Sequence, residues 1–184
     1  MIDDRIELKR QMRRQKKLAR FNKFILNCAI VVFSGLILFL IVNNLFFSIL
    51  TVSGQSMHPL YGDGDRVLIS RLRLDAEDLR HRDIIIFKGR DEEYYIKRII
   101  AKPGEVVEIY DGRVYVNGQA LEEDYLDEDF THTYNQNKWY IDKNHLFVLG
   151  DNRESFGSID SRFYGTIDVD QVRGRVLRKS IFSK

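Results

Sequence analysis

A serine and a lysine, Ser56 and Lys97, have the surroundings in this sequence that point most directly to chemistry. Ser56 lies in the segment SGQSMHP at 53–59, and Lys97 lies in YYIKRII at 94–100, an apolar run typical of a strand. A serine hydroxyl is a weak nucleophile that needs an adjacent base. A lysine can be that base where burial disfavours its ammonium form. The pair predicts nucleophilic catalysis; the alternative is that Lys97 is an ordinary solvated strand residue.

Alternation along a strand predicts where the Lys97 side chain points. Successive side chains of a strand lie on opposite faces, so Lys97 shares a face with Tyr95 and Ile99. This placement gives Lys97 apolar neighbours and directs Arg98 away from them. None of the four histidines of the chain has a comparable setting, so Lys97 is the better candidate for the base.

A second polar cluster, GDNRESFGSIDSR at 150–162, directly follows the apolar run LFVL at 146–149. Asp160 and Arg162 can form an ion pair that fixes this loop, and a serine within it can hydrogen-bond a lysine amine. A plain network of turn residues is the alternative. The alternating acids and the closing glutamate of a calcium loop are missing, so we expect no metal and no cofactor.

The first fifty residues have the pattern of a membrane anchor. Residues 1–23 contain nine Lys and Arg against three Asp and Glu, whereas residues 24–50 contain no charged residue. A helix needs roughly 20 apolar residues to cross a bilayer, which this stretch supplies. A cleavable secretion signal would have a core of about 7–15 residues and then a small-residue cleavage site, and neither is present. The positive flank should stay cytoplasmic and leave the rest of the chain outside the membrane.

The charge of the remaining chain argues against nucleic acid as a partner. The 184 residues have a net charge of +2, yet residues 24–184 hold 20 basic and 24 acidic residues. A basic face that binds phosphates is therefore not expected. The only cysteine, Cys28, lies within the apolar stretch, so the exported part must rely on packing and not on disulfides.

Beyond residue 50 the sequence consists of short apolar runs separated by turn signals. The expected strands lie at 49–52, 66–70, 83–87, 94–101, 105–110, 113–116, 146–149 and 172–177. Asp111-Gly112 predicts a hairpin turn, and residues 75–79 predict one short helical turn. These features indicate a mainly antiparallel β fold. The expected organisation is a basic cytoplasmic tail at 1–23, a transmembrane helix at 24–44 and an extracytoplasmic β domain at 45–184.

Residues 122–140 form an acidic and aromatic stretch without a clear period. We interpret it as a long loop or small insert on the β domain. Exposed acids of this kind usually serve solvation; binding of a partner is the alternative.

Taken together, these motifs resemble those of bacterial type I signal peptidases. The resemblance rests on four segments in order, which are 53–59, RDIIIF at 82–87, YIKRIIAKPGE at 95–105, and 150–162. The single span and short chain resemble the Gram-positive type. The resemblance implies a β catalytic domain behind one transmembrane helix, and a membrane-bound serine endopeptidase that removes signal peptides. Its partners would be exported preproteins and the lipid bilayer.

Residue by residue, the resemblance makes Ser56 the nucleophile and Lys97 the general base. Ser158 would hydrogen-bond the lysine amine, and Asp160 and Arg162 would hold the loop beside the pair. The backbone N–H of Ser56 would form part of the oxyanion hole. Substrate pockets for small side chains, one and three residues before the cut, would be bordered by Ser53, Gly54, Gln55 and Met57.

Two positions depart from the family pattern. Leu60 stands where the family usually has threonine, and two additional residues lie between Arg153 and Asp160. When the family motif is aligned on Asp160, Ser158 takes the position of the serine that hydrogen-bonds the lysine. When the motif is aligned on Gly150 instead, that position falls near Phe156, and the adjacent Ser155 is then the other candidate.

These departures keep a second function open: a non-catalytic relative that assists the assembly of surface fibres (pili). A self-cleaving repressor also uses a Ser–Lys pair on a β fold, but it would need a DNA-binding domain where this chain has an anchor. A plain membrane-tethered binding module would leave the four ordered motifs unexplained.

Overall fold

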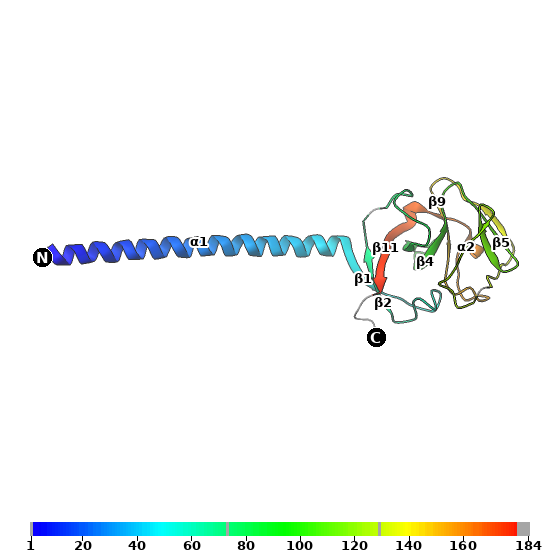
Figure 1. The fold of residues 1–184 in the computed structure, drawn as a ribbon, viewed down its shortest axis with the longest axis horizontal. Coiled ribbons are helices and arrows are strands. Elements are labelled where there is room, and N and C mark those ends of the chain that lie inside the picture. Colours follow the sequence, from blue (N-terminus) through cyan, green and yellow to red (C-terminus); the bar gives the residue numbers. More distant parts are fainter. Residues whose placement is uncertain (1, 73, 129, 180–184) are drawn as a thin grey trace. The chain divides into compact units, whose positions relative to one another are not determined.

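The structure is a computed structural model that describes residues 2–179 except 73 and 129. The chain divides into two units, Met1–Leu45 and Phe46–Lys184. The first unit is helical and the second is built of strands (Figure 1).

Helix α1 extends over Ile2–Phe46. Its part Lys16–Phe46 is the one stretch within the described residues that is long and apolar enough to cross a membrane. The helix includes the basic tail as well as the expected span at 24–44, because the tail contains good helix formers and neither proline nor glycine precedes Gly35.

The larger sheet of the second unit has seven antiparallel strands. In spatial order they are β1 (Phe47–Thr51), β2 (Arg66–Ser70), β11 (Val172–Lys179), β3 (Ile84–Lys88), β4 (Tyr94–Ala101), β9 (His145–Leu149) and β10 (Ile167–Asp168). Two short helices, α2 (Ser161–Tyr164) and the 3-10 helix η1 (Val169–Gln171), lie near its C-terminal strands in sequence.

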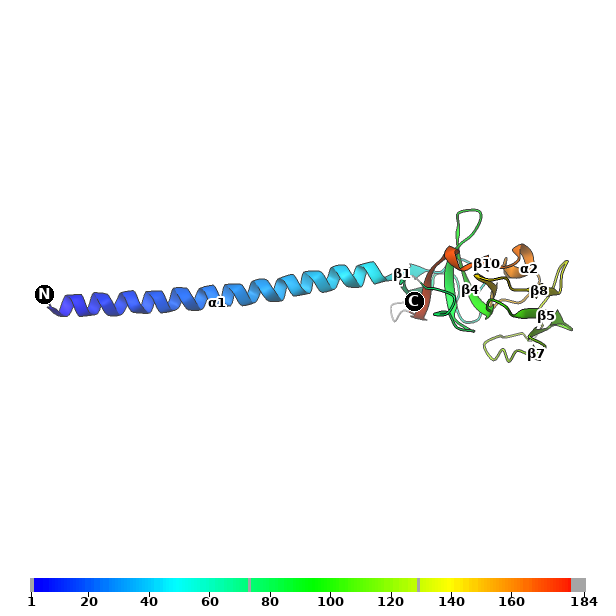
Figure 2. The ribbon, with the colours of Figure 1, turned by 90° about the horizontal axis from the view of Figure 1, so that it is seen from above.

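A second antiparallel sheet contains β7 (Gln119–Ala120), β6 (Arg113–Val116), β5 (Val106–Tyr110) and β8 (Lys138–Tyr140), in this order. Figure 2 shows it at one end of the β unit. The Asp111-Gly112 turn has positive φ at both positions, 49° and 73°, as a two-residue hairpin requires. The expected mainly antiparallel β fold is therefore confirmed. Strand β8 closes the acidic insert, and residues 76–78 form a single turn in which the Asp78 N–H donates to the Asp75 carbonyl at 3.0 Å.

The two faces of the large sheet are covered by different apolar clusters. On one, the Ile96 face, Ile86 and Ile96 pack with Val52 and Met57. The other face, the Tyr95 face, is covered by a second cluster, against which Tyr95 and Tyr164 pack. Its members include Phe87, Ile99, Leu146 and Ile167. This alternation follows the two-residue period of strands.

Strand β4 has one edge that is only partly covered. It pairs with β3 along Tyr94–Arg98, but β9 pairs with its other edge only from Arg98 onward. Along 94–97 that edge has no paired strand among the described residues. An unpaired edge can accept a further strand, and Lys97 lies at the end of this stretch.

Candidate active site

The structure brings Ser56 and Lys97 together from segments 41 positions apart in the sequence. The Lys97 Nζ donates a hydrogen bond to the Ser56 Oγ at 2.8 Å and another to the Ile96 carbonyl at 2.9 Å. Val52 and Met57, which flank Ser56, are buried in the core of the Ile96 face. They anchor the segment and leave the Ser56 side chain half-buried beside the amine.

Burial changes the acid–base chemistry of Lys97. The residue is 2% exposed, and this desolvation lowers the pKa of its amine from the ordinary 10.5 to about 8. The neutral form is thereby accessible close to physiological pH, as a general base requires. Two acids limit the shift, since Asp160 and Asp151 raise the pKa of Lys97. The sequence shows no acid next to Lys97; these carboxylates reach it only through the fold.

Arg98 is buried and does not point into solvent. Its Nε donates to Asp151 Oδ1 at 2.8 Å, its Nη2 donates to Asp151 Oδ2, and its Nη1 donates to the Arg82 carbonyl at 3.0 Å. The alternation placed Arg98 correctly on the face opposite Lys97. The alternation did not reveal that Asp151, from the polar cluster at 150–162, is the buried partner of Arg98 on that face.

Asp160 and Arg162 form the expected ion pair, with both side chains fully buried. Arg162 donates to both Asp160 oxygens at 2.8 Å, and the Gly150 N–H donates to Asp160 Oδ2 at 3.0 Å. Charged pairs of this geometry are about twice as strong as neutral hydrogen bonds. The ion pair holds the Asp160 carboxylate in place, and the bond from the Gly150 N–H then joins the start of the loop to its end.

Ser158 is buried beside the Ser56 main chain, whereas Ser155 is exposed. A Cβ placed on Gly150 would meet both Ser158 Oγ and the Ser56 carbonyl oxygen at 2.3 Å. Only glycine therefore fits between the two serines. The Ser158 Oγ has no hydrogen-bond partner among the described residues, so the expected contact with the Lys97 amine is not formed in this structure.

The acidic insert is bound to the same loop. Arg153, whose side chain is fully buried, donates to both carboxylate oxygens of Glu123, to Thr131 Oγ1 at 2.8 Å and to the Gly150 carbonyl at 2.9 Å. The Tyr125 ring lies 3.9 Å from the Arg98 guanidinium carbon, a cation–π distance. Glu123 is therefore a structural partner of the loop and not a solvating acid. Nothing in the sequence pattern indicated this pairing, because Glu123 and Arg153 lie 30 positions apart.

A groove with a volume of about 560 Å³ runs past Ser56 and Lys97. One wall is the segment 50–56 and the other is 93–97, at the uncovered edge of β4. Ser53, Gly54 and Gln55 line the groove as expected, whereas Met57 is fully buried in the core. Phe156, in the lengthened loop, lines it too, with φ of 62° and its N–H donating to the Tyr134 hydroxyl at 2.9 Å.

Comparison with known proteins identifies the family of the chain. Residues 25–180 match the family model of signal peptidase, peptidase S26. The chain belongs to this signal peptidase family. Signal peptidase IB of Staphylococcus aureus (strain COL) is 32% identical over 171 residues, which cover 84% of this chain and 88% of that protein. Signal peptidase I of Bacillus caldolyticus is 34% identical over 142 residues, 71% and 77% of the two chains.

Among solved structures, a signal peptidase I from Enterococcus faecalis is 34% identical, with a TM-score of 0.47; the match covers 54% of this chain and 97% of that one. As a member of the S26 family, the signal peptidase described here is a hydrolase of the serine protease class. Its substrates are proteins that carry signal peptides.

Proposed function

We propose that this signal peptidase cleaves membrane-associated preproteins with a dyad of Ser56 and Lys97. The observation that carries the proposal is the 2.8 Å contact of a buried lysine amine with a half-buried serine hydroxyl at the end of a peptide-sized groove. In the neutral state of Lys97 the same contact runs in the other direction, with the serine hydroxyl donating to the amine.

The proposed reaction begins when Ser56 Oγ attacks the scissile carbonyl while its proton passes to Lys97 Nζ. Lys97 then gives this proton to the leaving amine, and water hydrolyses the acyl-enzyme. The Ile96 carbonyl, which accepts from Nζ at 2.9 Å, orients the amine. Ser158 remains our candidate for a second partner of Lys97, since its buried hydroxyl lies near the Ser56 carbonyl and has no other partner among the described residues.

The uncovered edge of β4 suggests how the substrate binds. An extended peptide can add to such an edge through main-chain hydrogen bonds, while alternate side chains enter pockets. Side chains one and three residues before the cut would then face Ile86 and Ile96, beside Ser53, Gly54 and Gln55. Small side chains at these two positions are what the resemblance to signal peptidases implies.

Purified full-length protein in detergent micelles, incubated with a signal-bearing precursor, tests this function. We expect cleavage at one bond, identified by mass spectrometry of the new N-terminus. A matched precursor with phenylalanine in place of alanine just before the cut should be cleaved at least tenfold more slowly, because one excess group in a fitted pocket has an effect of about that size. Equal rates would contradict the pocket model, and no cleavage of either precursor would favour the fibre-assembly alternative.

We also propose that α1 anchors the enzyme with its N-terminus in the cytoplasm. The nine basic residues within 1–23 and the apolar span support this orientation. Protease added outside intact protoplasts should digest the β unit and spare an epitope tag fused before residue 1. Protection of the β unit together with loss of the tag would reverse the orientation.

A further inference from the structure

The peptide group between Gln55 and Ser56 carries two atoms that face opposite ways. Peptide groups are planar and, outside X–Pro bonds, essentially always trans, so the carbonyl and the N–H point in opposite directions. Whatever holds the Gln55 carbonyl therefore sets the direction of the Ser56 N–H. No acceptor for that N–H is present among the residues that the structure describes, so it is available to a substrate oxygen.

Asn152 holds this carbonyl from the loop that follows β9. Its Nδ2 donates to the Gln55 carbonyl at 3.3 Å, and the His58 N–H donates to the same oxygen at 3.0 Å. Both lone pairs of the carbonyl are then used. The main-chain N–H of Asn152 donates to the Ser56 carbonyl at 3.1 Å. Asn152 thus fixes the peptide groups on both sides of Ser56.

The side-chain amide of Asn152 is itself held in one orientation. Its Oδ1 accepts from the Glu154 N–H at 3.2 Å, which leaves Nδ2 to face Gln55. Gly157 packs against the same amide, because a Cβ at that position would meet Asn152 Oδ1 at 2.1 Å. Glu154 and Gly157 belong to the stretch in which this chain has two additional residues, so the lengthened loop supports the amide.

The loop is also anchored directly before Asn152. The Gly150 N–H donates to Asp160 Oδ2 at 3.0 Å, and the Asp151 carboxylate forms a buried ion pair with Arg98. Donors that are fixed before the reaction stabilise a developing oxyanion without further reorganisation. A side chain with such an anchor is suited to keep the N–H of the nucleophile in one direction.

We propose that Asn152 is a positioning residue for the reaction: its side-chain amide orients the peptide group between Gln55 and Ser56, so that the Ser56 N–H points at the oxygen of the scissile carbonyl as this oxygen becomes negative. The inference rests on the proposed function, in which Ser56 attacks that carbonyl. It gives the polar cluster at 150–162 a part in stabilising the transition state, in addition to its effect on Lys97.

Two variants of the full-length protein in micelles test the proposal. Asn152→Ala removes the donor while the His58 N–H still holds the carbonyl, so kcat should fall about tenfold, less than the 10²–10³-fold loss of an oxyanion donor itself. KM should stay nearly constant, because the lost interaction acts only in the transition state. Asn152→Asp places a carboxylate against the Gln55 carbonyl and should lower kcat further, each variant being compared on the plateau of its own pH profile.

A peptide aldehyde separates this effect from a loss of folded protein. Ser56 Oγ adds to the aldehyde carbon as its proton passes to Lys97, and the aldehyde oxygen takes the place of the oxyanion. The affinity for the aldehyde should weaken in Asn152→Ala by the same factor as kcat. The matching peptide alcohol, which cannot form the adduct, should bind as it does to the wild type. A smaller folded fraction would lower the rate without changing either affinity.

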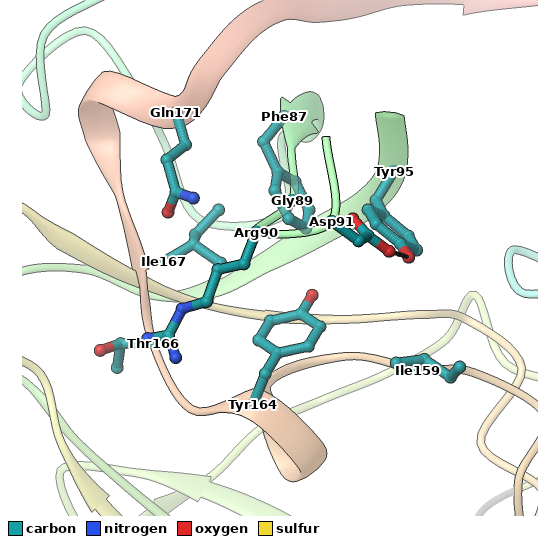
Figure 3. A pocket seen from close by; sticks show the side chains of 10 residues that line it. All are labelled: Phe87, Gly89, Arg90, Asp91, Tyr95, Ile159, Tyr164, Thr166, Ile167 and Gln171. Atoms are coloured by element: carbon teal, nitrogen blue, oxygen red, sulfur yellow. Dashed lines mark hydrogen bonds between the residues drawn. The ribbon is translucent and has the colours of Figure 1, made fainter. Parts of the chain in front are cut away.

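Thr166→Ala is the matched control. Thr166 is half-buried like Asn152, but it lines a neighbouring cavity of about 270 Å³ (Figure 3). This variant should keep the wild-type rate and both affinities.

Wild-type kcat and aldehyde affinity in both Asn152 variants would overturn the proposal, and so would equal weakening of the aldehyde and the alcohol. Failure of the wild type to cleave the precursor, or an aldehyde affinity that Ser56→Ala leaves unchanged, would instead refute the proposed function.

Discussion

Ser56→Ala and Lys97→Ala should each lower the rate of precursor cleavage by about 10⁴-fold or more. The serine supplies the attacking oxygen and the lysine takes its proton, and residues that act as one unit lose nearly everything when either is removed. The double variant should therefore be scarcely slower than either single variant. The measurement is single-turnover cleavage of a labelled precursor by the full-length protein in micelles.

Matched controls separate chemistry from folding. Ser155→Ala changes an exposed serine of the neighbouring loop, and Lys143→Ala changes an exposed lysine on the same domain; both should keep nearly the wild-type rate. A Lys97→Ala variant that retained a tenth of the activity would show that another group acts as the base. Additive losses in the double variant would argue against a dyad.

Lys97→Met should make the protein more stable near neutral pH while abolishing activity. The folded-state pKa of Lys97 is about 8 against an ordinary 10.5, so the unfolded chain binds the proton more readily. Stability of the wild type therefore falls as pH decreases from about 10.5 to about 8, and it stays low below that range. The shift corresponds to about 3 kcal/mol, a cost that methionine avoids while it keeps most of the packing.

Denaturant unfolding at several pH values would measure this difference. Trp139, the only tryptophan of the chain and 5% exposed in the β unit, gives a fluorescence signal for unfolding. The wild type should lose stability between pH 10.5 and 8 more steeply than Lys97→Met. Parallel pH curves, with the variant less stable throughout, would mean that the Lys97 ammonium is well solvated or paired in the folded protein.

The strands and the candidate dyad could be predicted because both depend on local pattern. Short apolar runs bounded by turn signals marked β3, β4 and β9, and the two-residue turn at Asp111 fixed the β5–β6 hairpin. Ser56 and Lys97 were recognisable because each sits in a short segment of unusual composition. The motifs led us to expect contact between the two side chains, but only the structure gives the distance between Lys97 Nζ and Ser56 Oγ.

The partners of the charged residues could not be predicted, because they come together only through non-local pairing. Asp151 lies 53 positions from Arg98, and Glu123 lies 30 positions from Arg153. A sequence shows which charges are present but not which are buried. For the same reason the effect of Asp151 and Asp160 on the pKa of Lys97 was missed.

The contact between the insert and the loop has a consequence for anyone who alters this enzyme. The acidic, aperiodic stretch around Glu123 is the segment that a protein engineer would first shorten or exchange. Yet its removal would leave the buried Arg153 without its paired carboxylate, and unpairing a buried ion pair costs about 3–5 kcal/mol. A replacement segment would have to bring a carboxylate for Arg153 and an aromatic ring for Arg98, so its chemistry matters more than its length.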